Sequence, residues 1–404
     1  MRHISFEILL IFVISTAILL FIALCSDLMF ESNVLYYGKW MHFDYIKTVE
    51  NFSNINLTAP YCWRLLVPFL VYMLPFSIEI GYFVITYFCI IVSSVLIYFI
   101  VKHLFVGLYY PWIGVLTYFS LIYVVRINAI EFISVDALAF TFILLSIFSI
   151  YKKKNLLFIV STALGILTKE TLFVVFPLYF TINYMPNQNR KFYNHLIYNT
   201  FILLSPAIII YILLIVIIVP NSNYNYLNIL IKTTQYRFDS FLGMFSTLNK
   251  DLFANQNNYE NSLINLYRIS LGAIGPILYF IILKAYKIRN YIIRLSPLLV
   301  LSFLQIFIAE DNERLVAVGF PAYILLYLFA IQSFVIENKI NIKYFLIYSL
   351  ANVVLQFFLT NDHYWQTYYS VVFQLILGLM MLAIIYSIRY VLLKKQINSS
   401  SQIL

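Results

Sequence analysis

Long apolar segments recur from one end of the chain to the other, and this feature limits its possible folds most. A helix rises 1.5 Å per residue, so about 20 apolar residues cross the roughly 30 Å hydrocarbon core of a bilayer. Segments of this kind lie near residues 8–26, 78–101, 105–124, 132–150, 196–219, 266–284, 295–309, 315–336, 344–360 and 368–391. Because helices satisfy their backbone hydrogen bonds internally, we expect an all-α, polytopic transmembrane helical bundle of about ten spans.

The composition excludes a water-soluble fold. Hydrophobic residues make up 63% of the 404-residue chain and charged residues 11%, whereas soluble domains average about 25% charged residues. The formal net charge is +9, and the Lys and Arg residues lie mainly in short connectors. This distribution follows the positive-inside rule, so we expect contact with membrane lipid and no nucleic-acid partner. The three cysteines form no CxxC pair, so neither a disulfide framework nor a thiolate metal site is indicated.

We expect one integral membrane domain over residues 1–404, with 8–26 as its first span. No small-x-small cleavage site follows that segment, which argues against a signal peptide. Two sizeable external loops are predicted, at 27–64 with interfacial helices and at 220–265. The apolar segment 64–76 is short and contains two prolines, so it should lie at the membrane interface or insert halfway.

Residues 155–184 are an apolar segment interrupted by Thr168-Lys169-Glu170. The positions of the charged residues predict whether this segment crosses the membrane once or turns back. With a cytoplasmic N-terminus, a single crossing here would place these later cations outside: Arg190, Lys191, Lys284, Lys287, Arg289, Arg294, Lys339, Lys343, Lys394 and Lys395. A helical hairpin that enters and returns keeps all of them inside. The positive-inside rule therefore predicts a hairpin with its tip at Lys169, and both chain termini in the cytoplasm.

The external side collects charges of both signs. An ionised side chain at the centre of a membrane helix costs roughly 2.5–3.5 kcal/mol, so each one needs a partner or a water-filled cavity. The set comprises Asp27, Glu31, Asp44, Glu50, Arg64, Arg126, Glu131, Asp136, Lys169, Glu170, Arg237, Glu310, Asp311, Glu313 and Arg314. Such a set suits a site that binds a phosphate and also needs a carboxylate base.

Three parts of this set can be interpreted further. Asp44 lies in an aromatic stretch and Arg64 begins the segment RLLVP. They could belong to an interfacial helix whose arginine reaches lipid headgroups, or hold a carboxylate and a cation beside a lipid-linked phosphate. Lys169 and Glu170 are adjacent, and neighbours on a helix point about 100° apart, so each should need another partner. Arg314 lies one turn into a span, where it could face a ligand or end a solvated turn.

Metal chemistry is not indicated. Asp362-His363 could imitate a metal site, but no second histidine at helical spacing supports it. We therefore expect a metal-independent site without a cofactor.

Several motifs occur in an order that resembles the polytopic GT-C-type glycosyltransferases and their uncharacterised bacterial relatives. These are Asp44-Tyr45, PYCWRLLVPFL at 60–70, EFISVDALAF at 131–140, a basic run, LGILTKET at 164–171 and DNERLVAVGFPAYI at 311–324. The resemblance covers mainly residues 40–180 and the stretch near 310–324. It implies a GT-C-like fold in the bacterial cytoplasmic membrane.

The resemblance also implies an activity, the transfer of a sugar from a polyprenyl-phosphate donor to a glycan, lipid or protein acceptor on the non-cytoplasmic face. Asp44 then matches the base, and Arg64, Lys169 and Arg314 are candidates for holding the donor phosphate. The site-supporting candidates are Glu131, Asp136, Glu170, Glu310 and Asp311. The chain departs from the family pattern because Asp44 has no acid beside it, which leaves Asp27 and Glu50 as alternative bases.

Two other functions remain open from the sequence. An O-antigen-type polymerase would share the aromatic bundle and the large external loops, and Arg237 would then gain importance. A transporter or flippase of lipid-linked glycans would also need a basic cavity. It would place charges deep in central helices and show internal repeats, and the sequence has no visible repeat.

Overall fold

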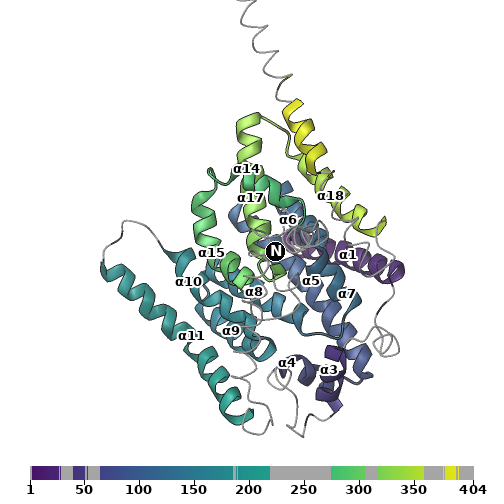
Figure 1. Cartoon of the computed structure of the whole chain (residues 1–404), viewed down its shortest axis with the longest axis vertical. Helices are drawn as coiled ribbons and strands as arrows, with labels where there is room; N and C mark the ends of the chain where they lie inside the picture. Colours follow the sequence, from purple (N-terminus) through teal and green to yellow (C-terminus); the bar gives the residue numbers. More distant parts are fainter. Residues whose placement is uncertain are drawn as a thin grey trace, which may run out of the picture.

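The computed structural model describes residues 2–26, 28, 40–50, 52, 64–184, 188, 190–218, 274–304, 316–358, 376, 378–387 and 390. Within these ranges every regular element is a helix and there is no β-strand (Figure 1). The prediction of an all-α chain is confirmed for this part of the protein.

Four helices are long and apolar enough to cross a membrane: α1 (Arg2–Cys25), α5 (Ile78–Leu104), α11 (Arg190–Ile218) and α17 (Phe320–Asn338). A fifth candidate is α6 (Tyr109–Ser120) together with the segment Ile122–Ile130, which bends away from it by 69°. The described residues thus contain four or five candidate spans, fewer than the number expected from hydropathy.

Helix length explains most of the difference. The helices α8 (Asp136–Tyr151), α15 (Arg289–Leu304) and α18 (Lys343–Phe358) each have 16 residues, which corresponds to about 24 Å of helix. The helix α14 (Ile277–Lys284) has 8 residues. The predicted segment 368–391 is described only at 376, 378–387 and 390. The larger number of spans stays a prediction.

Buried hydroxyl groups join neighbouring helices of the bundle. Hydrogen bonds link α1 to α5, α5 to α8, and α8 to α9 (Asn155–Thr168). The pairs are Ser15–Ser94, Ser93–Thr141 and Ser146–Ser161, at 2.8, 2.9 and 2.9 Å. Small hydroxyl residues suit a membrane bundle because they allow close approach and leave no polar group unpaired in an apolar interior.

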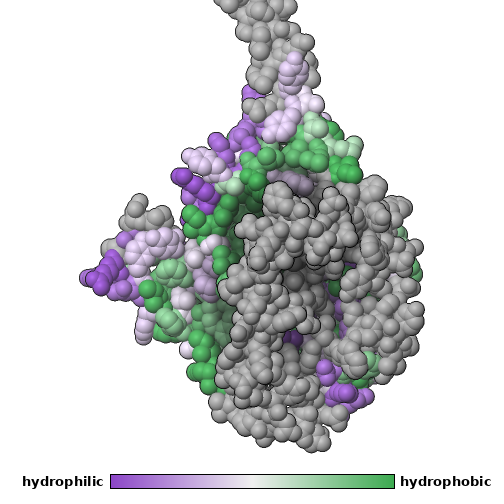
Figure 2. Space-filling model, viewed as in Figure 1, coloured by the Kyte–Doolittle hydropathy of each residue, from purple (hydrophilic) through white to green (hydrophobic). Residues whose placement is uncertain are grey.

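The outer faces of the bundle are apolar. Leu24 on α1 is 84% exposed and Phe201 on α11 is 66% exposed. Figure 2 shows wide hydrophobic areas, in green, on the described part of the surface. Water would not tolerate apolar faces of this extent, whereas lipid tails would, so several helices of this chain are suited to a membrane.

A second, smaller core lies beside the beginning of α5. The short helices α3 (Trp40–Glu50) and α4 (Leu66–Met73) pack there against the start of α5 and the segment before α8 (Figure 1). Its buried members are Tyr45, Ile46, Val49, Val67, Val71, Tyr82, Phe132, Ile133 and Val135. The α3 members are spaced one and three residues apart, which places them on one helical face.

The segment 155–184 reverses direction at Lys169. The helix α9 is followed by the 3-10 helix η3 (Glu170–Val174) and by α10 (Val175–Asn183). A Cβ atom added at Gly165 would lie 2.0 Å from Cδ2 of Leu172. The rings of Phe158 and Tyr179 lie 4.9 Å apart between centroids. These two contacts set α9 antiparallel to η3 and α10, with Lys169 and Glu170 at the tip.

Candidate functional site

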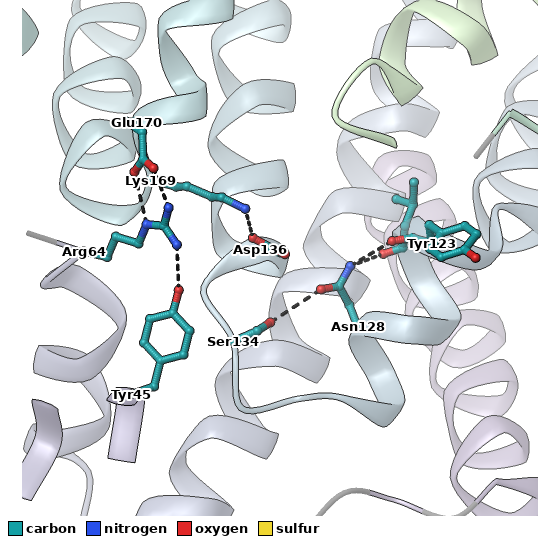
Figure 3. Close-up of polar contacts among 9 residues, drawn as sticks. Tyr45, Arg64, Tyr123, Asn128, Ser134, Asp136, Lys169 and Glu170 are labelled. Carbon is teal, nitrogen blue, oxygen red and sulfur yellow. Dashed lines mark hydrogen bonds and ion pairs between the residues drawn. The ribbon is translucent and has the colours of Figure 1, made fainter. Parts of the chain in front are cut away.

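Arg64 joins the tip of this hairpin to the helix α3 (Figure 3). Its Nε donates a hydrogen bond of 3.1 Å to Oε2 of Glu170, and its Nη2 donates to Oε1. Its Nη1 donates to the hydroxyl of Tyr45 at 3.1 Å. The arginine thus binds one carboxylate with two N–H groups, the strongest form of charge-assisted hydrogen bond, and also reaches a phenol.

A second ion pair lies next to the first. Nζ of Lys169 is 2.5 Å from Oδ1 of Asp136, and the two side chains are 13% and 8% exposed. Asp136 is the first residue of α8, where the helix dipole stabilises a carboxylate. The partners of the first pair, Arg64 and Glu170, are 12% and 25% exposed. Four charged side chains are therefore largely withdrawn from solvent within one small region.

The adjacent residues Lys169 and Glu170 have partners on two different elements. As expected from the sequence, neither relies on its neighbour. Lys169 has an extended backbone with φ −163° and ψ 138°, and successive side chains of an extended chain point to opposite sides. Lys169 therefore faces Asp136 on α8, and Glu170 faces Arg64, two residues before α4.

Arg64 determines the ionisation of Glu170, which lies outside the candidate spans. Burial alone raises the pKa of Glu170, but the guanidinium of Arg64 outweighs burial, and the pKa lies below its ordinary value. Glu170 is therefore a carboxylate at neutral pH. With both pairs ionised, the charges of Arg64, Lys169, Asp136 and Glu170 sum to zero, so the four side chains neutralise one another within the protein.

Asp44, the predicted base, lies on α3 one residue before Tyr45. Its side chain is half-buried, and its carbonyl oxygen accepts a 2.6 Å hydrogen bond from the hydroxyl of Thr48. The backbone carbonyl of Tyr45 accepts a 3.2 Å bond from the Tyr82 hydroxyl, which fixes α3 against α5. The carboxylate expected to act as base is thus on the same short helix that Arg64 contacts.

Glu131 is buried in the segment that leads into α8, and Arg126 is buried at the end of the π-helix η2 (Ile122–Arg126). Side chains that the sequence did not single out hold this segment. The Asn128 amide donates to the carbonyls of Tyr123 and Val124 at 3.3 and 2.9 Å, and the Ser134 hydroxyl donates to Asn128 at 3.5 Å (Figure 3). Thr86 of α5 donates to the carbonyl of Phe132 at 2.8 Å. These bonds set where Asp136 begins α8.

Several predicted site residues lie outside the described residues: Asp27, Arg237, Glu310, Asp311 and Arg314. Glu50, an alternative base, is exposed on the last turn of α3. Within the part of the chain that the structure describes, no group of three or more His, Cys, Asp or Glu side chains could hold a metal ion. The site can be built only from the residues around Arg64 and Lys169.

Among the contacts of this cluster, sequence reasoning missed Tyr45 as a partner of Arg64. Its sequence signals are the aromatic stretch around Asp44 and the Asp44-Tyr45 motif, and neither specifies a contact.

The chain matches no family model, no curated protein and no solved structure in three separate comparisons.

Proposed function

We propose that this protein is a membrane glycosyltransferase that uses a polyprenyl-phosphate-linked sugar as donor. The observation that carries the proposal is the 3.1 Å bond from Arg64 to Tyr45, the neighbour of Asp44. It brings a guanidinium to the helix that carries the predicted base. A base near the acceptor and a cation near the leaving phosphate are the two groups that this reaction needs.

In the proposed reaction, the acceptor hydroxyl attacks the anomeric carbon of the donor sugar. The new C–O bond forms as the bond between that carbon and the phosphate oxygen breaks. Asp44 takes the proton of the attacking hydroxyl, and the released polyprenyl phosphate keeps the electron pair of the broken bond. Arg64 stabilises the negative charge that develops on the phosphate, because a guanidinium offers several N–H donors in one plane.

The proposed placement in the membrane follows from the charges at the two ends of α5 and α8. Lys102 and Lys152 lie at their C-terminal ends, where Lys102 pairs with Glu7 and Lys152 lies 3.2 Å from a nitrogen of His103. Arg64 and Asp136 lie at the other end. The positive-inside rule then puts the termini in the cytoplasm, the site on the non-cytoplasmic face, and a bundle of about ten spans between.

The proposal is tested with Asp44→Asn in purified protein supplied with polyprenyl-phosphate sugars and a set of acceptors. Release of polyprenyl phosphate, followed by chromatography, should fall by about 10²-fold or more, because the variant lacks a general base. The comparison is Glu50→Gln, the exposed alternative base on the same helix, which should retain transfer if Asp44 is the base. Wild-type rates in Asp44→Asn would overturn the assignment of the base.

Mass spectrometry of lipid that copurifies with the wild-type protein separates the transferase from the flippase. Bound polyprenyl-phosphate sugar together with turnover supports the transferase. Bound lipid that is moved across vesicle membranes without cleavage would overturn it in favour of a transporter.

A further inference from the structure

The stability of the hairpin tip does not require its two ion pairs. Withdrawing four charges from water is costly, and replacing a buried ion pair with apolar residues of similar volume is often neutral or stabilising. The hairpin already has apolar contacts, between Gly165 and Leu172 near the tip and between Phe158 and Tyr179 farther along its two arms. Apolar packing could hold the tip closed, so the pairs call for another explanation.

Their geometry supplies one. Lys169 has an extended backbone and Glu170 begins η3 directly after it, so a shift of one side chain's anchor moves the other. Asp136 is held at the start of α8 by the network around Asn128 and Ser134. The Lys169–Asp136 pair therefore transmits the position of a rigid helix end to Glu170, and Glu170 orients Arg64.

We propose that Lys169 and Asp136 are positioning residues, whose ion pair fixes the hairpin tip so that Glu170 aims the Arg64 guanidinium beside Tyr45. In this assignment Lys169 does not contact the donor phosphate. The inference rests on the proposed function for what Arg64 binds. It goes further by giving the two cations different roles: Arg64 contacts the substrate, and Lys169 positions Arg64.

Arg64 also connects the hairpin tip to α3, the helix that carries the predicted base Asp44. Its third N–H bond reaches the Tyr45 hydroxyl on α3, and the Tyr82 hydroxyl holds the same residue by donating to the Tyr45 carbonyl. A displaced tip would therefore disturb the guanidinium and the helix that carries Asp44 together.

The test is a double-mutant cycle with Lys169→Met, Asp136→Leu and the combined variant, each purified in detergent. Each single variant leaves one charge unpaired, so each should lower the Tm. Each should also weaken binding of undecaprenyl phosphate, used as the probe, by about tenfold or more. The combined variant places two apolar side chains at the same position and should recover most of both losses. If either single variant fails to fold, Lys169→Gln and Asp136→Asn give a milder cycle.

Recovery of the Tm without recovery of undecaprenyl phosphate binding would show that Lys169 contacts the phosphate and would overturn the inference. Losses of Tm that simply add in the combined variant would overturn it too. The matched control is the exposed pair at the opposite end, with Lys102→Met and Glu7→Leu combined, which should leave probe binding unchanged. If wild-type protein does not bind the probe, the proposed function fails, whereas the Tm cycle still decides whether the two residues are coupled.

Discussion

At the scale of single residues, Arg64 connects three parts of the chain that are far apart in sequence. It binds Glu170 with Nε and Nη2 and reaches Tyr45 with Nη1. A lysine has one ammonium group on a flexible stem and could not make two parallel bonds to a carboxylate while holding a third partner. The arrangement therefore depends on a planar guanidinium and not only on its charge.

The lowered pKa of Glu170 predicts how this pair depends on pH. Below its ordinary pKa the unfolded chain binds a proton that the folded protein, held by Arg64, does not. The stabilisation from the pair is therefore complete above that ordinary value and is lost as the pH falls through the lower folded pKa. Unfolding in detergent between about pH 7 and pH 3 should show a loss of wild-type stability that is smaller in Glu170→Gln. Equal pH dependence of the two proteins would contradict the ion pair.

The sequence singled out the charged residues of this cluster, but it did not predict which of them pair. Arg64, Asp136, Lys169 and Glu170 stand out because charges are scarce and costly near apolar helices. Their pairing depends on tertiary packing, because Arg64 and Glu170 are 106 positions apart and Asp136 and Lys169 are 33 apart. No local pattern encodes separations of that kind.

At the scale of helices, the hairpin depends on the absence of a side chain at Gly165. The helix α9 packs mainly against α8 and α11, while α10 packs mainly against α15. The two arms come closest near the tip, where Leu172 of η3 occupies the space that a Cβ atom of residue 165 would need. The glycine allows the chain to turn back immediately after α9.

Gly165→Ala should destabilise the protein although alanine is the better helix former. The exchange gains about 1 kcal/mol in helix propensity, but forcing extra volume into a packed contact costs about 1–3 kcal/mol. Leu172 is fully buried and cannot swing aside into solvent. We expect a lower Tm in detergent, and a smaller loss when Gly165→Ala is made in a Leu172→Ala background, where the space is open.

The control is Leu164→Phe, which enlarges an exposed neighbour on the same helix and should leave the Tm almost unchanged. A Tm for Gly165→Ala equal to or above that of the wild type would contradict the close contact with Leu172.

Hydropathy predicted where helices occur but not where they break. The segment 78–101 corresponds to α5, which extends to Leu104. The segment 105–124 contains α6, whose helix ends before Leu121, a residue with φ −85° and ψ 104°. Neither Gly nor Pro marks this break, and packing decides it: the residues after it carry Asn128 and continue toward the site. A window average cannot detect such a turn.

At the scale of the whole molecule, the described charges divide between two ends of the bundle. Lysines at one end pair with Glu7 and Glu337, and Nζ of Lys343 lies 5.9 Å above the ring of Tyr109. The other end carries the mixed pairs around Arg64. This separation is what a chain needs if one end faces the cytoplasm and the other carries a polar site, because only Lys and Arg strongly bias orientation.

Accessibility of single cysteines tests the hairpin and the orientation together. Starting from a variant without Cys25, Cys62 and Cys89, a cysteine is introduced at Lys153, Lys191 or Glu50, all exposed positions. Lys153 precedes α9 and Lys191 follows α10, so a hairpin keeps both on the cytoplasmic side. A membrane-impermeant maleimide should label Glu50→Cys in intact cells, and should label Lys153→Cys and Lys191→Cys only after permeabilisation.

The Lys191 position distinguishes the alternatives because a single crossing by residues 155–184 would move it to the opposite side from Lys153. Labelling of Lys191→Cys, but not Lys153→Cys, in intact cells would therefore contradict the hairpin. It would also place later cations such as Lys284 and Lys343 outside, against the positive-inside rule. Labelling of both in intact cells, with Glu50→Cys protected, would leave the hairpin in place and invert the bundle. The Arg64 cluster would then face the cytoplasm, where a donor on the non-cytoplasmic face could not reach it.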